Sequence, residues 1–488
     1  MSSPAPSSAL AVSAASGVKW TTAATAITSV LTIVQGLVVA RFLGPGEYGL
    51  MAAAVVVVGL GKTFADGGMS AAVVAREMSR ETLSSLFWFN MATGFAIALV
   101  VFLSAPLVAD FYGEPGVAEI VRWAALIFVF APAGAQFGQL LTRALDFRRL
   151  AVQQVVPAIF GTAVAIPAAV SGAGAVSLIW AMVTTAAVNS LMTASVAWRR
   201  WPPTHGFSWA LLRPHFGFGA YQMGERALNF AQTNVDYVLI GRFLNATALG
   251  SYSLAYNLVT RPLFVINPIV TRVAFPIFAR KQDDDRALER GYLQVARVIA
   301  YVTTPLLAGL LVVAPEFVTV VLGPKWEASV PILQILCLLG IFRCLINPVG
   351  TVLLAKNRPD IGFKGTVVSF TAMLGLLLVA VQFGLIATAW TGVGVTVTFW
   401  IAWLYVLRRL IGLRWSRYAT ELAKPVLLTC AMAGLLVVAR AGLGGLPAGA
   451  LLATLVAGGG LLYAAGALIL DRAWLTGIWR LFRRPRQT

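Results

Sequence analysis

The chain has 488 residues, of which 59% are hydrophobic and only 11% are charged. Soluble globular proteins carry about 25% charged residues, so this composition excludes a soluble enzyme and an intrinsically disordered protein. The 37 Lys and Arg residues outnumber the 19 Asp and Glu residues and give a net charge of +18, which is typical of proteins that bind nucleic acid or anionic membrane lipid, or of the cytoplasmic side of a membrane protein.

Fourteen apolar stretches are each long enough to cross a bilayer as a helix, which takes about 20 residues. In the first half they lie near residues 20–41, 48–72, 83–108, 119–142, 152–170, 175–197 and 216–241. In the second half they lie near residues 249–275, 292–313, 328–354, 362–383, 386–408, 424–440 and 447–469. The predicted fold is therefore an all-α polytopic membrane protein with 14 transmembrane helices.

The basic residues predict the orientation of these helices. With the N-terminus in the cytoplasm, 28 of the 37 Lys and Arg residues fall on the inner side and five on the outer side. Cytoplasmic loops carry such an excess, so both termini are predicted to be cytoplasmic, and nucleic acid is no longer an expected partner. The predicted organisation is a disordered tail (1–18), an N-lobe (19–200), a C-lobe (201–412), two further helices (413–470) and a basic tail (471–488).

The predicted loops are short, which bears on the class of protein. The longest outer connection, around residues 315–328, has about 14 residues, whereas enzymes that use lipid-linked sugars on the outer face need a sizeable domain there. The stretch GLGKT at 59–63 resembles the end of a phosphate-binding loop, but Val56 stands where that motif needs Gly. We therefore expect no nucleotide site. The two histidines have no cysteine or carboxylate at ligand spacing, so we expect no metal site and no cofactor.

Short matches in the same order indicate an internal repeat. RFLGPGEYG at 41–49 corresponds to RFLNATALG at 242–250, so that Gly49 matches Gly250 at an offset of 201. Ala105-Pro106 corresponds to Ala314-Pro315, and Pro132 corresponds to Pro348, at slowly increasing offsets. Helices 1–6 and 7–12 are thus predicted to be parallel repeats related by an axis along the membrane normal.

Polar residues form one stripe on helix 7 and an equivalent stripe on helix 1. The helix 7 stripe contains Gln222, Arg226, Asn229, Thr233 and Asp236, which lie within an arc of roughly 80°. The helix 1 stripe contains Thr21, Thr25, Thr28, Thr32 and Gln35, each 201 residues earlier. Hydrogen bonding within or between helices accounts well for helix 1 alone. It accounts poorly for helix 7, because charges within a span are costly, and we expect both stripes to line an aqueous cavity.

The remaining charges within the spans are predicted to belong to the same cavity. Its basic residues are Lys62, Arg226 and Arg261, and its acidic residues are Asp66, Glu225 and Asp236. The basic residues would attract an anionic substrate, and the acidic residues are candidates for ion coupling. Self-paired ions that only stabilise the bundle are the alternative, and the sign of the cavity charge stays open.

The sequence resembles Wzx-type oligosaccharide flippases of the MOP superfamily, near the branch of colanic acid exporters. The matching stretches are RFLGPGEYGLMA (41–52), FADGGMSAAVVARE (64–77), LSSLFWFN (83–90), FYGEP (111–115), NVDYVLIGRFL (234–244), LGSYSLAYNL (249–258), RVAFPIFARKQDD (272–284), GPKWEASVPILQILCLLGI (323–341) and NRPD (357–360). They are specific as a set and extend over residues 18–410.

This resemblance implies two MATE-like six-helix lobes and the flipping of an undecaprenyl-pyrophosphate-linked oligosaccharide across the bacterial inner membrane. It also implies polysaccharide polymerase and co-polymerase as partners. Related lipid II flippases use cationic residues on helices 1, 2 and 8. Here Lys62 and Arg261 match in kind, whereas helix 1 offers only Thr and Gln, and Arg226 is expected to substitute.

Three other functions stay open from the sequence. A multidrug or cation antiporter of the same superfamily would use the membrane acids Asp66, Glu225 and Asp236. A membrane glycosyltransferase or polymerase is disfavoured by the short outer loops. A lipid scramblase or structural scaffold has no sequence feature that excludes it.

Overall fold

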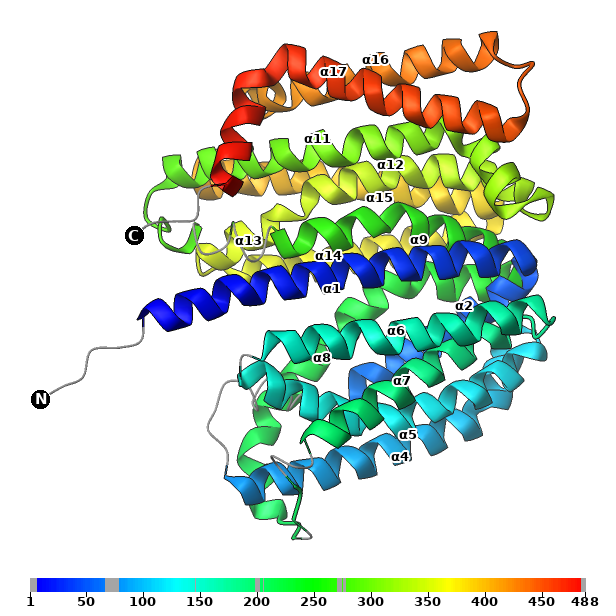
Figure 1. The fold of residues 1–488 in the computed structure, drawn as a ribbon, viewed down its shortest axis with the longest axis vertical. Helices are drawn as coiled ribbons and strands as arrows, with labels where there is room; N and C mark the ends of the chain where they lie inside the picture. Colours follow the sequence, from blue (N-terminus) through cyan, green and yellow to red (C-terminus); the bar gives the residue numbers. More distant parts are fainter. Residues whose placement is uncertain are drawn as a thin grey trace, which may run out of the picture. The chain divides into compact units, whose positions relative to one another are not determined.

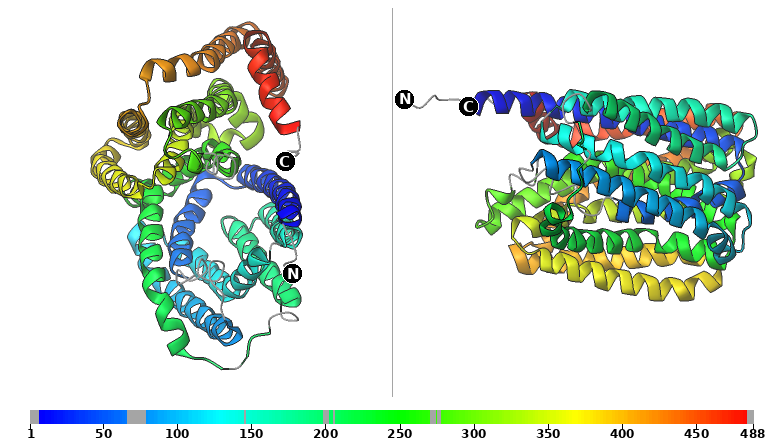
Figure 2. Two further views of the ribbon diagram at one scale, coloured as in Figure 1. Left: turned by 90° about the vertical axis from the view of Figure 1, so that its left-hand side faces the viewer. Right: turned by 90° about the horizontal axis from the view of Figure 1, so that it is seen from below.

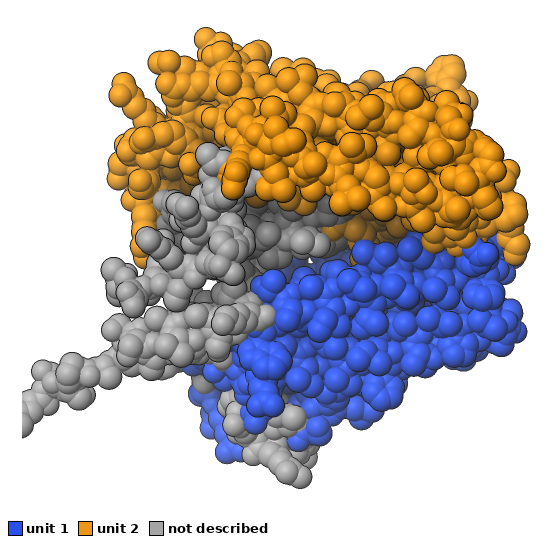
Figure 3. Space-filling model, turned by 45° about the horizontal axis from the view of Figure 1, so that its top comes forward, with its two compact units in different colours: residues 1–253 blue, residues 254–488 orange. Residues whose placement is uncertain are grey.

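The computed structural model describes residues 7–65, 79–144, 146–197, 202–204, 206–269, 274 and 278–483. Their regular structure is helical throughout, with no strand in these ranges, which confirms the all-α prediction. The chain divides into two compact units, Met1–Ser253 and Leu254–Thr488 (Figure 3). Within each unit the long helices run roughly alongside one another (Figures 1 and 2).

Unit 1 is built from seven described helices and the beginning of an eighth. They are α1 (Ser7–Phe42), α2 (Pro45–Ala65), α4 (Arg80–Tyr112), α5 (Gly116–Arg143), α6 (Phe147–Val170), α7 (Val176–Ala197), α8 (Trp209–Phe243) and the start of α9 (Ala246–Ile269). The ends of α4 show why the chain turns where it does. Ser79 caps its first turn by accepting a hydrogen bond from the Thr82 amide, and Gly113 ends it in the left-handed conformation, at φ 68°.

Unit 2 contains the remainder of α9 and the helices that follow it. These are α11 (Asp285–Phe317), the π-helix η2 (Val318–Leu322), the 3-10 helix η3 (Pro324–Ser329), α12 (Val330–Ile346), α13 (Pro348–Ala355), α14 (Pro359–Ala380), the 3-10 helix η4 (Val381–Phe383), α15 (Leu385–Ile411), α16 (Trp415–Gly442) and α17 (Ala448–Arg483). A buried core joins α11, α12, α13, α15 and α16 around Tyr292, Val352 and Leu407.

Twelve segments of the described chain are long and apolar enough to cross a membrane. The predicted seventh and eighth spans are helical as α8 and α9, but neither is among those twelve. For α8 the reason is the polar stripe, which lowers its mean hydropathy. For α9, the side chains of residues 262–269 lie outside the described part of the chain. A multi-pass helical membrane protein is confirmed, and the total of 14 spans stays a prediction.

The structure differs from the predicted organisation near the N-terminus and near residue 200. Residues 7–18, expected to be disordered, form the start of α1, where they continue the apolar helix that follows them. The helix α8, expected to open the C-lobe, packs against α2 and α4 and belongs to unit 1. The two units are defined by packing contacts, whereas the predicted lobes are defined by the sequence repeat. The units therefore do not test the lobes, and the division into lobes stays a prediction.

Two predicted segments have a different local structure. The continuous helix expected near 328–354 is divided into α12 and α13 at Asn347. Asn347 keeps helical backbone angles (φ −48°, ψ −45°), but Pro348 has no amide hydrogen with which to continue the helical hydrogen bonds. The expected outer loop around 315–328 is almost entirely helical, as the end of α11 followed by η2 and η3. The Trp326 side chain of η3 is fully buried, which fixes this connection against the core.

The starts of α2 and α9 cross at a pair of glycines that the repeat predicts to be equivalent. A Cβ built on Gly49 would overlap the carbonyl oxygen of Ala246 and lie 3.0 Å from the amide nitrogen of Gly250. A Cβ on Gly250 would overlap the carbonyl oxygen of Pro45 and lie 2.9 Å from the amide nitrogen of Gly49. Pro45 and Ala246 are themselves 201 residues apart. Each repeat therefore presents the same surface to the other here, as in a local twofold contact.

A group of charges around the buried Asp471 side chain joins α11, α16 and α17 in unit 2. Arg297 of α11 pairs with Glu421 of α16 at 2.6 Å and also with Asp471 of α17. Asp471 is 6% exposed, pairs with Lys424 at 3.1 Å and accepts a 2.8 Å hydrogen bond from the Tyr301 hydroxyl. Its backbone is non-helical (φ −143°, ψ 29°), so α17 bends there. We call these five residues the Asp471 cluster.

Candidate functional site

Two predicted cavity cations lie on neighbouring helices of unit 1. The helices α2 and α8 pack where Gly59 faces Phe230, so closely that a Cβ on Gly59 would overlap the Phe230 ring. They are the second and seventh long helices and run in opposite directions (Figure 1). Lys62 comes one turn after Gly59, and Arg226 comes one turn before Phe230. Both cations therefore lie at the same level, on the same side of this contact.

The polar residues of this site on α2 and α8 divide into an accessible group and a buried residue, Asp236. Lys62, Arg226 and Asn229 are exposed, and Thr233 is partly buried with its hydroxyl donating to the Asn229 carbonyl at 2.7 Å. An ammonium group, a guanidinium and a carboxamide on adjacent turns can all donate hydrogen bonds to an anion. This group of side chains is suited to a phosphate-bearing ligand.

Asp236 does not share the accessible surface of the α8 stripe. It is 4% exposed, accepts a 2.7 Å hydrogen bond from the Tyr252 hydroxyl and accepts another at 3.0 Å from the Tyr237 amide. Tyr237 and Tyr252 are also in edge-to-face contact, with centroids 5.9 Å apart. Through Tyr252 the Asp236 carboxylate connects α8 to the beginning of α9. This structural role accounts for an acidic residue inside α8.

The stripe on α1 is directed partly at its own backbone and partly at α6. Thr28 and Thr32 donate to carbonyl groups one turn earlier, at 2.9 and 2.7 Å. Thr28 also accepts a 3.4 Å hydrogen bond from Gln154, and Gln35 accepts a 3.0 Å hydrogen bond from Thr162. Gln154 and Thr162 of α6 are partners that the sequence analysis did not identify. Their spacing of eight residues, which puts them on one helix face, was the available signal.

For three other candidates the structure gives only part of the information. Arg261 is partly buried and belongs to unit 2. Asp66 lies outside the described residues, and Glu225 lies in α8 but its side chain is outside the described part. In the described ranges no group of three or more His, Cys, Asp or Glu residues could hold a metal ion.

Comparison with known proteins identifies relatives along most of the chain. A family model described as "polysaccharide biosynthesis protein" matches residues 38–331. The chain is 34% identical over 423 residues to the teichuronic acid biosynthesis protein TuaB of Bacillus subtilis (strain 168), covering 86% of this chain and 87% of TuaB. It is 30% identical over 423 residues to the lipopolysaccharide biosynthesis protein WzxC of Escherichia coli (strain K12), covering 85% of each.

A solved structure shows the same fold. The lipid II flippase MurJ in its inward closed conformation matches with a TM-score of 0.75 at 13% identity, covering 94% of this chain and 100% of that one. The resemblance to Wzx-type flippases of the MOP superfamily is thereby confirmed. Since the family model matches more than half of the sequence and two relatives match almost all of it, the chain belongs to the polysaccharide biosynthesis protein family.

Proposed function

We propose that this chain moves an undecaprenyl-pyrophosphate-linked oligosaccharide repeat unit from the inner to the outer leaflet, for export of a cell-surface polysaccharide. Membership of the polysaccharide biosynthesis protein family, 29% identity over 62% of the chain to the succinoglycan biosynthesis transport protein ExoT of Rhizobium meliloti (strain 1021), and the fold of the lipid II flippase MurJ support a transporter of lipid-linked oligosaccharide rather than an enzyme. The chain is a multi-pass inner-membrane protein, and we propose that both termini are cytoplasmic. Polysaccharide polymerase and co-polymerase are its proposed partners.

The observation that supports the proposed site is the common level of Lys62 and Arg226 on α2 and α8. A pyrophosphate carries several negative charges, and two cations on adjacent helices would bind it through charge-assisted hydrogen bonds. Arg261 is proposed to contribute a third positive charge. The cations would replace part of the water that the pyrophosphate loses on leaving the bulk.

The remaining candidates are proposed to bind the oligosaccharide. Asn229, Thr233 and Thr32 would solvate sugar hydroxyls, while Thr28 and Gln35 would do so from the side of α1 that also contacts α6. The prenyl chain would stay among the lipid tails, because moving it into water is unfavourable. We propose that the two lobes alternate between an inward-open and an outward-open cavity, the mode of transport that parallel repeats support.

A cation antiporter is the second candidate, favoured only by the acidic residues. Asp66 and Glu225 are still candidates for ion coupling, but the Asp236 carboxylate is already engaged by Tyr252 and Tyr237. Purified protein in liposomes distinguishes the two functions. An antiporter moves a fluorescent cation under a proton or sodium gradient, whereas the proposed flippase changes the leaflet of a prenyl-pyrophosphate oligosaccharide without moving that cation.

The double variant Lys62→Ala, Arg226→Ala is expected to reduce polysaccharide export at least about tenfold, since loss of one charge-assisted contact already weakens binding by about 1.5–3 kcal/mol. Export is measured in a strain that lacks the chromosomal copy, at matched levels of membrane protein. The control Lys62→Arg, Arg226→Lys keeps both charges and is expected to retain most export. Wild-type export by the alanine variant would refute the assignment of these two residues.

A further inference from the structure

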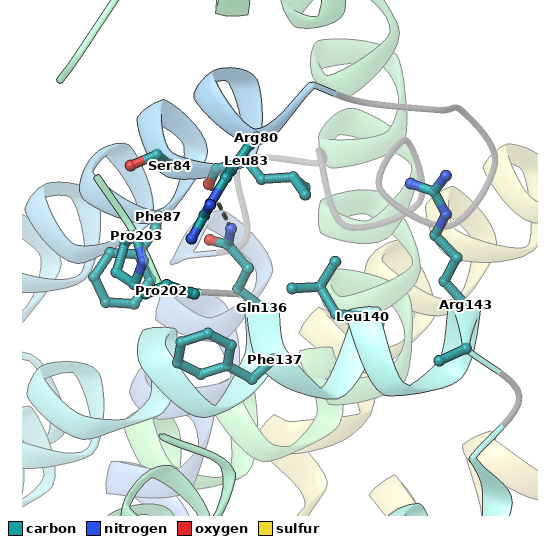
Figure 4. A pocket seen from close by; sticks show the side chains of 11 residues that line it. Arg80, Leu83, Ser84, Phe87, Gln136, Phe137, Leu140, Arg143, Pro202 and Pro203 are labelled. Carbon is teal, nitrogen blue, oxygen red and sulfur yellow. Dashed lines mark hydrogen bonds between the residues drawn. The ribbon is translucent and has the colours of Figure 1, made fainter. Parts of the chain in front are cut away.

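A pocket of about 490 Å³ lies at one end of unit 1, away from the α2–α8 site. Its walls are the first two turns of α4, the last two turns of α5, and Pro202 and Pro203 of the segment that leads to α8 (Figure 4). Pockets that hold small ligands have volumes of about 300–1,000 Å³. The pocket is therefore large enough for a headgroup and its first attached carbons.

The pocket has an apolar floor and a basic rim. Leu83, Phe87, Phe137 and Leu140 contribute the apolar surface, and all but Leu83 are members of one buried core cluster. Arg80 enters from the start of α4 and Arg143 from the end of α5. These two arginines place positive charge on the rim of the pocket.

Gln136 fixes the inner wall. This side chain is 4% exposed and points from α5 toward α4, where its amide donates to the Leu83 carbonyl at 2.7 Å (Figure 4). Its carbonyl accepts a 3.4 Å hydrogen bond from Asn90. Both ends of the amide are engaged within the protein, so it supports the wall and leaves ligand recognition to the two arginines.

The proline wall is also held in place. The Ser84 hydroxyl and the Trp88 indole both donate to the Thr204 carbonyl, at 2.6 and 2.9 Å. Four residues later the Ser208 amide donates to the Ser85 hydroxyl at 3.0 Å. These bonds connect the segment before α8 to the first turns of α4. A preformed pocket loses little conformational entropy when it binds.

A neighbouring pocket of about 470 Å³ between α5, α6 and α7 provides a comparison. It is lined by Arg148 and Arg149, but Asp146 lines it too and pairs with Arg149 at 3.0 Å. Its positive charge is therefore partly neutralised. Both pockets lie at the end of unit 1 where α4 starts and α5 ends, the end that the distribution of basic residues predicts to be cytoplasmic.

We propose that the pocket between α4 and α5 binds the phosphate headgroup of an anionic lipid of the inner leaflet. Arg80 and Arg143 bind the phosphate oxygens, and the first carbons of the lipid lie on Leu83, Phe137 and Leu140. Basic pockets between transmembrane helices at the cytoplasmic surface bind such headgroups. The phosphate belongs either to a glycerophospholipid or to a prenyl phosphate, and this inference is independent of transport.

The test measures lipids retained by the purified full chain in native mass spectrometry. Wild-type protein is compared with two double variants. The first combines Arg80→Gln with Arg143→Gln. The second combines Arg148→Gln with Arg149→Gln and removes the same charge from the neighbouring pocket. Each protein is offered phosphatidylglycerol, phosphatidylcholine or undecaprenyl phosphate. We expect the first variant to lose about tenfold in phosphatidylglycerol retention, the second to resemble wild type, and no protein to retain phosphatidylcholine.

Each outcome decides the inference. Displacement of phosphatidylglycerol by undecaprenyl phosphate from wild type but not from the Arg80, Arg143 variant identifies prenyl phosphate as the ligand. Ala144→Trp fills the mouth of the pocket from an exposed position with no change of charge, and it is expected to lower retention as well. Unchanged retention in the Arg80, Arg143 variant, or equal loss in both arginine variants, overturns the proposal.

Discussion

Gly250→Ala is expected to destabilise the protein by about 3 kcal/mol, the upper part of the usual range for overpacking. A Cβ at this position overlaps the carbonyl oxygen of Pro45, and a backbone atom cannot turn aside as a flexible side chain can. The start of α9 must then move away from the start of α2. The expected result is a lower unfolding midpoint in detergent, followed by circular dichroism, and reduced polysaccharide export.

The reciprocal change and a matched control complete this experiment. Gly49→Ala is expected to have an effect of similar size, because its Cβ overlaps the carbonyl oxygen of Ala246. Gly36→Ala in α1 places its Cβ where no atom lies within 4 Å, and it should raise helix stability by a few tenths of a kcal/mol or more. If the two crossing variants unfold like Gly36→Ala, the close approach of α2 and α9 is wrong.

Asp471→Asn is expected to have the second large effect, a loss of about 3 kcal/mol, as for other buried ion pairs that lose one member. The substitution leaves Arg297 and Lys424 with Glu421 as the remaining carboxylate of the cluster. Since Arg297 belongs to α11 and the other charges to α16 and α17, the change weakens the attachment of the last two helices. Unfolding in increasing dodecyl sulfate, followed by circular dichroism, measures the loss.

The control for this variant is an exposed ion pair of the same composition. Asp360 pairs with Arg358 at 2.9 Å, and their side chains are 46% and 50% exposed. Water screens such a pair, so Asp360→Asn is expected to unfold with the wild type. Asp471→Glu keeps the charge and should recover part of the stability. Equal unfolding of Asp471→Asn and Asp360→Asn would show that the Asp471 cluster contributes nothing.

The helical organisation was largely predictable because the bilayer imposes it. Apolar length alone located every long helix, since lipid offers no partner to unpaired backbone groups. Local breaks were less visible. The division at Pro348 is a local effect of a proline inside an apolar run. The helical turns of 318–329 depend on packing such as that which buries Trp326. A hydropathy window carries neither kind of information.

The candidate site was predictable in its residue types and less so in its partners. Charge within an apolar span identified Lys62 and Arg226, and the contact of Gly59 with Phe230 places them at one level. The helical spacing of polar residues predicted a polar stripe on α1 like that on α8. It could not indicate that Gln35 of this stripe accepts a hydrogen bond from Thr162 of α6. The pairing of Arg297 with Asp471 could not be predicted either, because the two residues are 174 positions apart in the sequence.

The glycine crossing has a consequence for how the two halves of this chain can change over time. The carbonyl group of Ala246 occupies the space that a side chain on Gly49 would need, and that of Pro45 does the same for Gly250. Neither position can therefore accept a larger residue unless the two helices move apart. Reciprocal contacts of this kind are what two copies of a shorter polypeptide form about a twofold axis. The crossing thus has the form of a homodimer interface within one continuous chain. If the two halves arose by gene duplication, this is a contact that two copies of the original polypeptide could have formed with each other.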